Sequence, residues 1–443
     1  MTDFAYRAVL GVARLALSYY YEEVEVHAAA EVPPSGPLLI LANHQISLVD
    51  PLLLAHAVPR PVRFLAKASL FAIPGLAPLM RRVGAIGVHR REDGRANHDN
   101  TALYDAIAEA LIDGAAIGIF PEGVSHDNPM LGAFRHGAAR IALDTEDRAD
   151  FDLGLQVLIV GIHIEDSRLF RGRVLVNVAR PFSVRHYGPA YRADPHAAIE
   201  RLTVELKAQL SASVLEAESF EDLQLAGLIE SLDLLHHDEP GMHGAFTRKK
   251  FILEQYRRLR DTHPAQVRLI RELLILYRDA LAFEPPTAER QWLFSIVDLL
   301  RRVVFIGPVI ALGLATNALP FLCVRALAIA LTRVQHRGQD VRASLGIMLG
   351  VPIFFGWYAL LGWWTYQRFG LSLALLLVTL SPLAGLTAVT RLAIWKNTLR
   401  RLLVSLAGYL TRHDPRSTDR MRQVLREQIA KLYAQGRAGD APR

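Results

Sequence analysis

A histidine and an aspartate near the start of the chain are the residues best suited to acid–base chemistry. His44 and Asp50 stand in the stretch LLILANHQISLVDP, residues 38–51. A neutral imidazole can take a proton from a hydroxyl, and a carboxylate on its other ring nitrogen fixes the tautomer and stabilises the imidazolium. A structural alternative stays open: Asp50 before Pro51 also suits a helix N-cap, and His44 could bond a backbone carbonyl.

A second segment carries residues that suit a phosphorylated polyol. Residues 120–125 read FPEGVS, and residues 134–138 read FRHGA. The carboxylate of Glu122, the backbone N–H groups that Gly123 can bring close, and the fixed cation of Arg135 would suit such a ligand. The plain alternatives are a turn at 121–123 and a solvated helix face at Arg135.

A third segment, GAIGVHRR at residues 84–91, places Arg90 and Arg91 directly after a short apolar run. Two arginines at the end of a strand could hold an anion. When this stretch is viewed alone, a surface basic patch is the simpler interpretation.

The elements around these residues alternate between strands and helices. Short apolar runs predict strands, helical periodicity predicts helices between them, and 24–27 alternates like an edge strand. The predicted strands are 24–27, 38–42, 62–66, 85–88, 115–120, 157–164 and 174–178, with helices over 99–113 and 137–143. We therefore expect an α/β domain over residues 22–215, with a mostly parallel sheet flanked by helices. In such sheets, working groups gather beyond the carboxyl ends of strands, where His44 and Glu122 fall.

The rest of the chain differs in character. Of 443 residues, 51% are hydrophobic, the net charge is +6, and Cys323 is the single cysteine, so no intrachain disulfide can form. The charge suits an anionic membrane surface at least as well as nucleic acid, and we expect no nucleic-acid partner. No cysteine–histidine–carboxylate cluster has metal-ligand spacing, so no metal is expected.

The remaining segments predict attachment to a membrane. We expect an interfacial helix over 1–21 (or an ordinary helix packed on the domain), a helical connector over 216–290, a membrane region over 291–395 and a basic tail over 396–443. The runs 344–364 and 371–390 are long enough to form a transmembrane hairpin. The run 303–324, broken by prolines and positive at both ends, predicts a re-entrant or kinked segment, although a third crossing stays open. The arginines that flank the hairpin predict that the α/β domain faces the cytoplasm at the inner membrane.

Taken together, the motifs resemble the glycerophospholipid acyltransferase family. The resemblance covers roughly residues 35–185, and its sequence blocks occur in the family's order. They are Asn43-His44 with Asp50, residues 84–90, residues 120–125, residues 157–161 and the closing run FRGRVLVNVARPF at 170–182. The helical connector and the apolar C-terminal segments look more like the branch that acylates glycerol-3-phosphate or dihydroxyacetone phosphate.

The resemblance implies a role for each matching residue. His44 would be the general base and Asp50 its orienting partner. The acceptor would be bound by Asn43, Arg90, Glu122, Gly123 and Arg135. The implied reaction moves a fatty acyl group from acyl-CoA or acyl carrier protein, as co-substrate, to a hydroxyl of glycerol-3-phosphate or 1-acyl-glycerol-3-phosphate. No further cofactor is implied.

The sequence departs from the family pattern in three places. Five residues separate His44 from Asp50, where four are commonest, and Val124-Ser125-His126 replaces a threonine and an arginine, so one expected cation is missing. The block at 158–161 lacks its usual proline. Two alternatives therefore remain: transfer to another lysolipid, or a membrane lipid-binding or scaffold protein whose catalytic site has decayed.

Overall fold

The chain divides into two compact units, each described by itself. The structure is a computed structural model that describes residues 3–46, 49–68, 71, 76–88, 101–126, 128–165, 172–232, 241–281, 291–334, 340–389, 391 and 416–438. The first unit, called here the sheet unit, comprises Met1–Glu216, Gly241–His243 and Thr332–Ser344. The second, called the helical unit, comprises Ala217–Pro240, Gly244–Leu331 and Leu345–Arg443.

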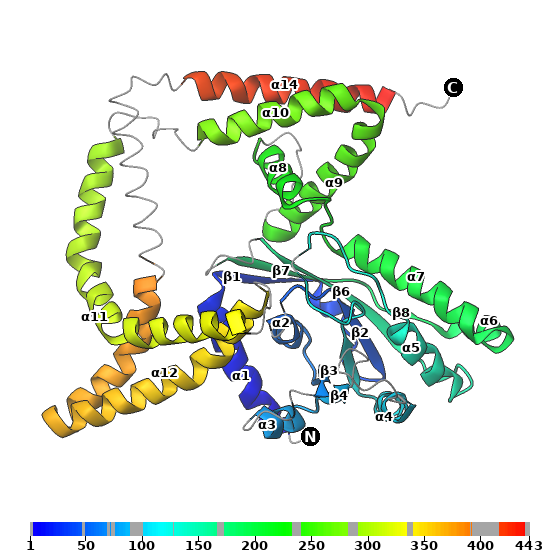
Figure 1. The fold of residues 1–443 in the computed structure, drawn as a ribbon, viewed down its shortest axis with the longest axis horizontal. Coiled ribbons are helices and arrows are strands. Elements are labelled where there is room, and N and C mark those ends of the chain that lie inside the picture. The colour runs from blue at the N-terminus through cyan, green and yellow to red at the C-terminus, as the bar shows by residue number, and fades with distance from the viewer. Residues whose placement is uncertain are drawn as a thin grey trace. The chain divides into compact units, whose positions relative to one another are not determined.

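The sheet unit is built on one mixed, mostly parallel sheet in the order β1-β7-β6-β2-β5-β3-β4, with β8 paired to β6 (Figure 1). Its strands are β1 (Glu23–His27), β2 (Leu38–Ala42), β3 (Val62–Lys67), β4 (Ile86–Val88), β5 (Ala116–Ile119), β6 (Gln156–Ile164), β7 (Arg173–Val178) and β8 (Phe182–Ser183). Strand β2 lies at the centre, parallel to both β5 and β6. Only the pairs β6–β7 and β6–β8 run antiparallel among the described strands. The predicted α/β class with a mostly parallel sheet is confirmed.

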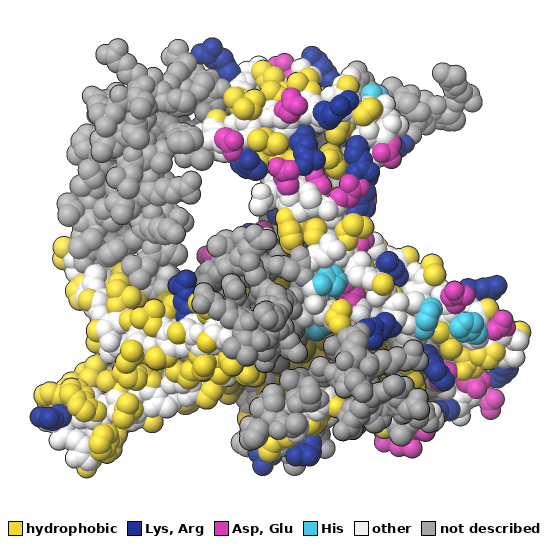
Figure 2. All heavy atoms as spheres, viewed as in Figure 1, with side chains coloured by type: hydrophobic (Ala, Val, Ile, Leu, Met, Phe, Trp, Pro, Cys, Tyr) yellow, Lys and Arg dark blue, Asp and Glu magenta, His cyan; other side chains and the backbone are white. Residues whose placement is uncertain are grey.

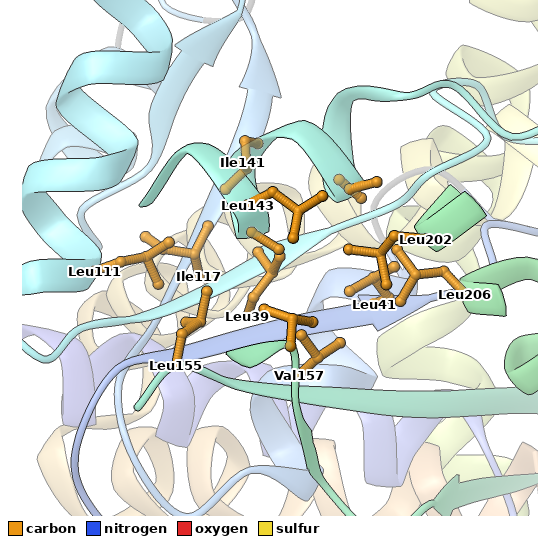
Figure 3. Close-up of a cluster of buried hydrophobic side chains, with 14 of the residues drawn as sticks. Leu39, Leu41, Leu111, Ile117, Ile141, Leu143, Leu155, Val157, Leu202 and Leu206 are labelled. Carbon is orange, nitrogen blue, oxygen red and sulfur yellow. The ribbon is translucent and has the colours of Figure 1, made fainter. Parts of the chain in front are cut away.

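Helices cover both faces of this sheet, which explains why its central strands are continuous apolar runs. The helices are α1 (Asp3–Tyr20), α2 (Val49–Ala57), α3 (Leu76–Arg82), α4 (Thr101–Ile112), α5 (Gly137–Asp147), α6 (Gly188–Ala193) and α7 (Pro195–Ser213), with 3₁₀ turns at Ala29–Glu31 and Arg185–Tyr187. On one face, Leu39 and Leu41 of β2 pack with Ile117 of β5 and with side chains of α4, α5 and α7 (Figure 3). On the other face, α2 packs against β6 and β7. All five side chains of β2 are fully buried, so its carboxyl end is held firmly.

Helix α1 packs along α2 by one side. Ala13 and Leu17 are buried, and the buried Tyr6 accepts a hydrogen bond at its hydroxyl from the backbone N–H of Val62, at 3.2 Å. The opposite side is open, with Leu15 69% exposed. One side of the helix is therefore packed on the domain, as the second interpretation of the sequence expected. Contact of the open side with a membrane stays a prediction.

The helical unit contains a bundle of α8 (Phe220–Ser231), α9 (Gly241–Thr262, of which residues from 244 onward belong here), α10 (Pro264–Leu281) and α14 (Arg416–Ala438). Helix α14 lies along α10 (Figure 1) and buries Leu425, Ile429 and Leu432 in a shared apolar core. The Nε of Arg422 donates to the hydroxyl of Tyr277 at 2.9 Å. The apolar side of the predicted tail is therefore used inside the protein, and any contact with headgroups is left to its polar side.

Three helices of this unit are long and apolar enough to cross a membrane, over Ile306–Leu331, Met348–Phe369 and Leu371–Val389. They lie in α11 (Gln291–Val334), in α12 (Asp340–Phe369) and in the helix that follows Gly370. Their exposed hydrophobic side chains cover the lower left of Figure 2. The last two match the two arms of the predicted hairpin.

Helix α11 holds the proline-containing run 303–324. It is continuous, contains Pro308 and Pro320, and is bent in Figure 1. Proline removes a helical hydrogen bond and clashes with the preceding turn, which is the usual cause of a sharp bend.

A polar cluster joins the three apolar helices. The Nδ2 of Asn317 donates to the carbonyl of Ser381 at 3.0 Å, and its Oδ1 accepts from the Tyr358 hydroxyl at 2.5 Å. The indole N–H of Trp357 donates to the carbonyl of Thr316 at 2.6 Å. Hydrogen bonds between helices in an apolar medium fix which faces meet, at roughly 1 kcal/mol each.

Gly313 allows α11 to pack tightly against the helix Leu371–Val389. A Cβ at this position would lie 2.2 Å from the carbonyl oxygen of Ala384, whereas a Cβ on Gly356 of α12 would meet nothing within 4 Å. We predict that Gly313→Ala lowers the free energy of unfolding by about 1–3 kcal/mol. Gly356→Ala, the matched control, should be neutral or slightly stabilising, because alanine favours helix over glycine.

Thermal unfolding of the two variants in the same detergent checks this prediction. Equal midpoints for Gly313→Ala and wild type would show that the two helices do not approach this closely.

Candidate active site

The side chains of His44 and Asp50 meet at the carboxyl end of β2. The Nδ1 of His44 lies 2.9 Å from the Oδ2 of Asp50, and the histidine ring stacks on Phe120, with centroids 4.2 Å apart. Because Nδ1 faces the carboxylate, Nε2 is the nitrogen left for a substrate. This is the arrangement of a base and its orienting carboxylate.

The loop between β2 and α2 is wrapped around the Asp50 carboxylate. Its Oδ2 also accepts the backbone N–H groups of Gln45 and Ile46, each at 2.7 Å. Helix α2 begins at Val49, so Asp50 lies in its first turn and bonds backwards into the loop. The N-cap interpretation of Asp50 is therefore wrong: the carboxylate holds the histidine loop rather than the start of the helix.

Asp50 is completely buried, and its Oδ1 accepts no hydrogen bond from the described residues. Burial raises the pKa of Asp50 above the ordinary value for aspartate, and the hydrogen bonds from His44, Ile46 and Gln45 act in the opposite direction. A raised pKa in the folded state means that folding favours the protonated carboxyl. The stability that Asp50 contributes is therefore present at low pH and lost as the pH rises through its folded pKa.

Glu122 comes from the loop after β5 and holds the same histidine from the other side. Its Oε1 accepts the backbone N–H of His44 at 2.9 Å. Its Oε2 accepts the backbone N–H of Gly132 at 2.7 Å and contacts the Nε2 of His126. The Glu122 side chain is only 1% exposed, so in this structure its carboxylate binds the protein itself. Binding of the acceptor by Glu122 stays a prediction.

A cavity of about 470 Å³ opens onto His44. Its lining includes the basic residues Arg135, Arg140 and His136. It also includes the apolar residues Leu65, Val88, Leu103, Ile107, Ile119 and Ile141. A cavity with both kinds of lining fits an amphipathic substrate that carries an anionic group.

Gly123 and Arg135 meet at the wall of this cavity. Gly123 has a φ of +74°, and a Cβ there would lie 3.0 Å from the Nε of Arg135, so both backbone and space favour glycine. The backbone N–H of Arg135 donates to the carbonyl of Pro121 at 3.0 Å, which ties the two predicted segments together.

Asn43, another predicted binding residue, is not among the residues that line this cavity. The amide of Asn43 is buried and makes two hydrogen bonds to the backbone of Ile162, at 2.9 and 2.7 Å, so it joins β2 to β6. Arg90 lies outside the described residues. Its role, like that of Asn43 in substrate binding, stays a prediction.

Sequence reasoning missed His126 and Arg140. His126 was noted only as part of a departure from a pattern. Arg140 lies on α5 with its guanidinium carbon 5.0 Å from the ring centre of Tyr104. The one available signal for Arg140 was its place in the predicted helix 137–143, directly after the segment that carries Arg135.

Comparisons with known proteins identify an acyltransferase domain over the segment that contains these residues. Residues 23–165 match the family model described as Acyltransferase, a span that contains β1 to β6 and all the residues above. The glycerol-3-phosphate O-acyltransferase 2 of Saccharomyces cerevisiae is 29% identical over 29% of this chain and 17% of its own length. A 1-acyl-sn-glycerol-3-phosphate acyltransferase of Borreliella burgdorferi is 30% identical over 28% of this chain and 47% of its own length. These matches support an acyltransferase domain of the glycerophospholipid acyltransferase kind over residues 23–165.

Two further likenesses concern more of the chain. An uncharacterized acyltransferase of Schizosaccharomyces pombe is 23% identical over 81% of this chain and 68% of its own length. The crystal structure of the 1-acyl-sn-glycerophosphate acyltransferase of Thermotoga maritima aligns with 48% of this chain and 84% of its own, at 22% identity and a TM-score of 0.35. The chain aligns with less than half of the length of the Saccharomyces cerevisiae and Borreliella burgdorferi relatives.

The buried carboxylate gives a prediction that separates chemistry from folding. We expect Asp50→Asn to lower the rate of the catalysed reaction by roughly 10²–10⁴-fold, because a neutral amide cannot stabilise an imidazolium. The same change removes a buried charge, so the thermal midpoint at neutral pH should stay the same or rise. Activity and unfolding measured on one preparation check both parts. Undiminished activity in this variant would contradict the role of Asp50.

Proposed function

We propose that the protein transfers a fatty acyl group from an acyl thioester to a hydroxyl of glycerol-3-phosphate or of 1-acyl-glycerol-3-phosphate. The observation that carries this proposal is the His44–Asp50 pair, 2.9 Å apart and open to a cavity with basic and apolar walls. The family supplies the reaction class, and the cavity supplies the match to a phosphorylated acceptor and an acyl chain.

The proposed step needs no covalent intermediate on the protein. The Nε2 of His44 takes the proton of the acceptor hydroxyl as its oxygen attacks the thioester carbonyl. Asp50 stabilises the imidazolium that forms. The tetrahedral intermediate then collapses, the carbon–sulfur bond breaks, and the thiolate leaves with the proton that His44 returns. The products are an ester and a free thiol.

The residues that line the cavity suggest what each substrate would contact. Arg135 and Arg140 offer cations to the acceptor's phosphate, and guanidinium groups bind phosphate oxygens well. The apolar part suits the hydrocarbon of an acyl chain. The donor is acyl-CoA or acyl carrier protein, since both present the same thioester.

The retained site argues against a decayed lipid-binding protein. A scaffold has no need for a fully buried carboxylate bonded to a histidine that lines a cavity. Transfer to another lysolipid is the remaining alternative, and it would use the same residues.

An acyl-transfer assay tests the proposal. Purified protein is given labelled acyl-CoA or acyl carrier protein with glycerol-3-phosphate, 1-acyl-glycerol-3-phosphate and uncharged glycerol. We expect transfer to a phosphorylated acceptor, and we expect His44→Ala to abolish it while the thermal midpoint stays near that of wild type. Full activity in His44→Ala would remove this residue from the mechanism, and no transfer from either donor would favour the binding protein.

We also propose that the protein is anchored in the inner membrane with the sheet unit in the cytoplasm. Helices α10 and α14 pack on each other, so the chain leaves and returns on one side of the membrane. A chain that does so crosses an even number of times. We propose that the hairpin of α12 and Leu371–Val389 supplies two crossings, and that the bent α11 enters and returns on one side, although its segment Ile306–Leu331 is long and apolar enough to cross. Arg325 and Arg391, which stand outside the hairpin, favour the cytoplasmic side.

Cysteine labelling tests this arrangement. Cys323 is the single cysteine, so Cys323→Ser gives a background in which one new thiol reports one position. We expect a membrane-impermeant maleimide to reach Glu109→Cys and Gln423→Cys from the cytoplasmic side and Arg368→Cys, in the hairpin turn, from the opposite side. Labelling of Glu109→Cys and Gln423→Cys from opposite sides would contradict the even number of crossings, and labelling of Arg368→Cys from the same side as both would contradict the hairpin.

A further inference from the structure

The loop after β5 forms hydrogen bonds with both the backbone N–H and the backbone carbonyl of His44. The N–H of His44 donates to Glu122 Oε1 at 2.9 Å, and the carbonyl of His44 accepts the backbone N–H of His126 at 3.2 Å. Phe120 of the same segment stacks on the His44 ring. The segment 120–126 therefore touches the base at three points.

The side chain of His126 closes this arrangement. Its Nε2 is bonded to Glu122 Oε2, on the carboxylate whose other oxygen holds the N–H of His44. Its Nδ1 accepts the backbone N–H of Asn128 at 3.3 Å. A neutral imidazole that accepts at Nδ1 carries its proton at Nε2, so His126 is a donor to Glu122.

The space around this pair is shaped for it. A Cβ on Gly132 would lie 2.9 Å from Glu122 Oε2 and 2.9 Å from His126 Nε2. The backbone N–H of Gly132 donates to the same Oε2 at 2.7 Å. Glycine at this position lets the backbone approach a carboxylate that already holds an imidazole.

We propose that His126 is a positioning residue for the acyl-transfer reaction: through Glu122 and its own backbone N–H it fixes the peptide of His44, and so directs Nε2 of His44 at the acceptor hydroxyl. Asp50 sets the orientation of the His44 ring, and His126 sets the backbone from which that ring projects. This inference rests on the proposed function. It assigns no contact between His126 and substrate, because His126 is not among the residues that line the cavity.

Side-chain amides of two lengths provide a matched set of variants for the Nε2–H donor of His126. The amide nitrogen of glutamine falls near the place of a histidine Nε2, whereas the shorter asparagine places its amide near Nδ1. His126→Gln can therefore still donate to Glu122, whereas His126→Asn and His126→Ala cannot. A small error in the position of a base is enough to lower a rate by about 10- to 100-fold.

Steady-state kinetics of these variants and of wild type tests the proposal, with thermal unfolding measured on each preparation. We expect His126→Ala and His126→Asn to lower kcat by about 10- to 100-fold, with the KM for the acceptor within about twofold of wild type. His126→Gln should restore kcat to within about threefold of wild type. In a Glu122→Gln background, His126→Ala should add no further loss, because His126 acts through that carboxylate.

Three results would overturn the proposal. Wild-type kcat in His126→Ala would show that the base needs no such support. A raised KM for the acceptor at unchanged kcat would make His126 a ligand for the substrate. An equal loss in the glutamine, asparagine and alanine variants would show that the Nε2 donor is not what matters. A wild-type protein that transfers to no acceptor would instead refute the proposed function, and this inference would fall with it.

Discussion

A single buried oxygen atom organises the loop at the carboxyl end of the central strand β2. Oδ2 of Asp50 is bonded to the ring Nδ1 of His44 and accepts hydrogen bonds from the backbone N–H groups of the next two residues, Gln45 and Ile46. A buried carboxylate is costly unless donors surround it, so the loop folds around the charge and the imidazole becomes one of its ligands. The ring of His44 and the backbone of Gln45 and Ile46 are thus held by one group.

The strand that precedes His44, β2, lies at the centre of the sheet. Strand β2 is paired on both sides with parallel strands, and all of its side chains are buried. Asn43 extends the β2–β6 connection past the last strand pair by bonding the backbone of Ile162. The neighbouring strand β5 delivers Phe120 and Glu122 to the same place. Three adjacent strands therefore meet around the histidine, which is why residues from distant parts of the sequence can fix one side chain.

Much of this could be predicted from the sequence, because the signals are local. Short apolar runs gave the strands, and the Asn43-His44 and Glu122-Gly123 blocks followed two of them directly. The backward bonding of Asp50 could not be predicted, since aspartate before proline is equally typical of a helix N-cap. The contact between His126 and Glu122 is likewise invisible in one sequence, because its purpose appears only when the His44 backbone, 78 positions away from Glu122, is in place.

The pairing of α10 with α14 has a consequence for how the protein is made. Leu425, Ile429 and Leu432 complete an apolar core whose other half ends at Leu281. The ribosome has to synthesise the whole intervening hydrophobic stretch before that core can close. Until then α10 lacks the part of its apolar cover that α14 supplies, although α8 and α9 also pack in this core. A chain truncated before residue 416 would therefore expose apolar surface to its neighbours.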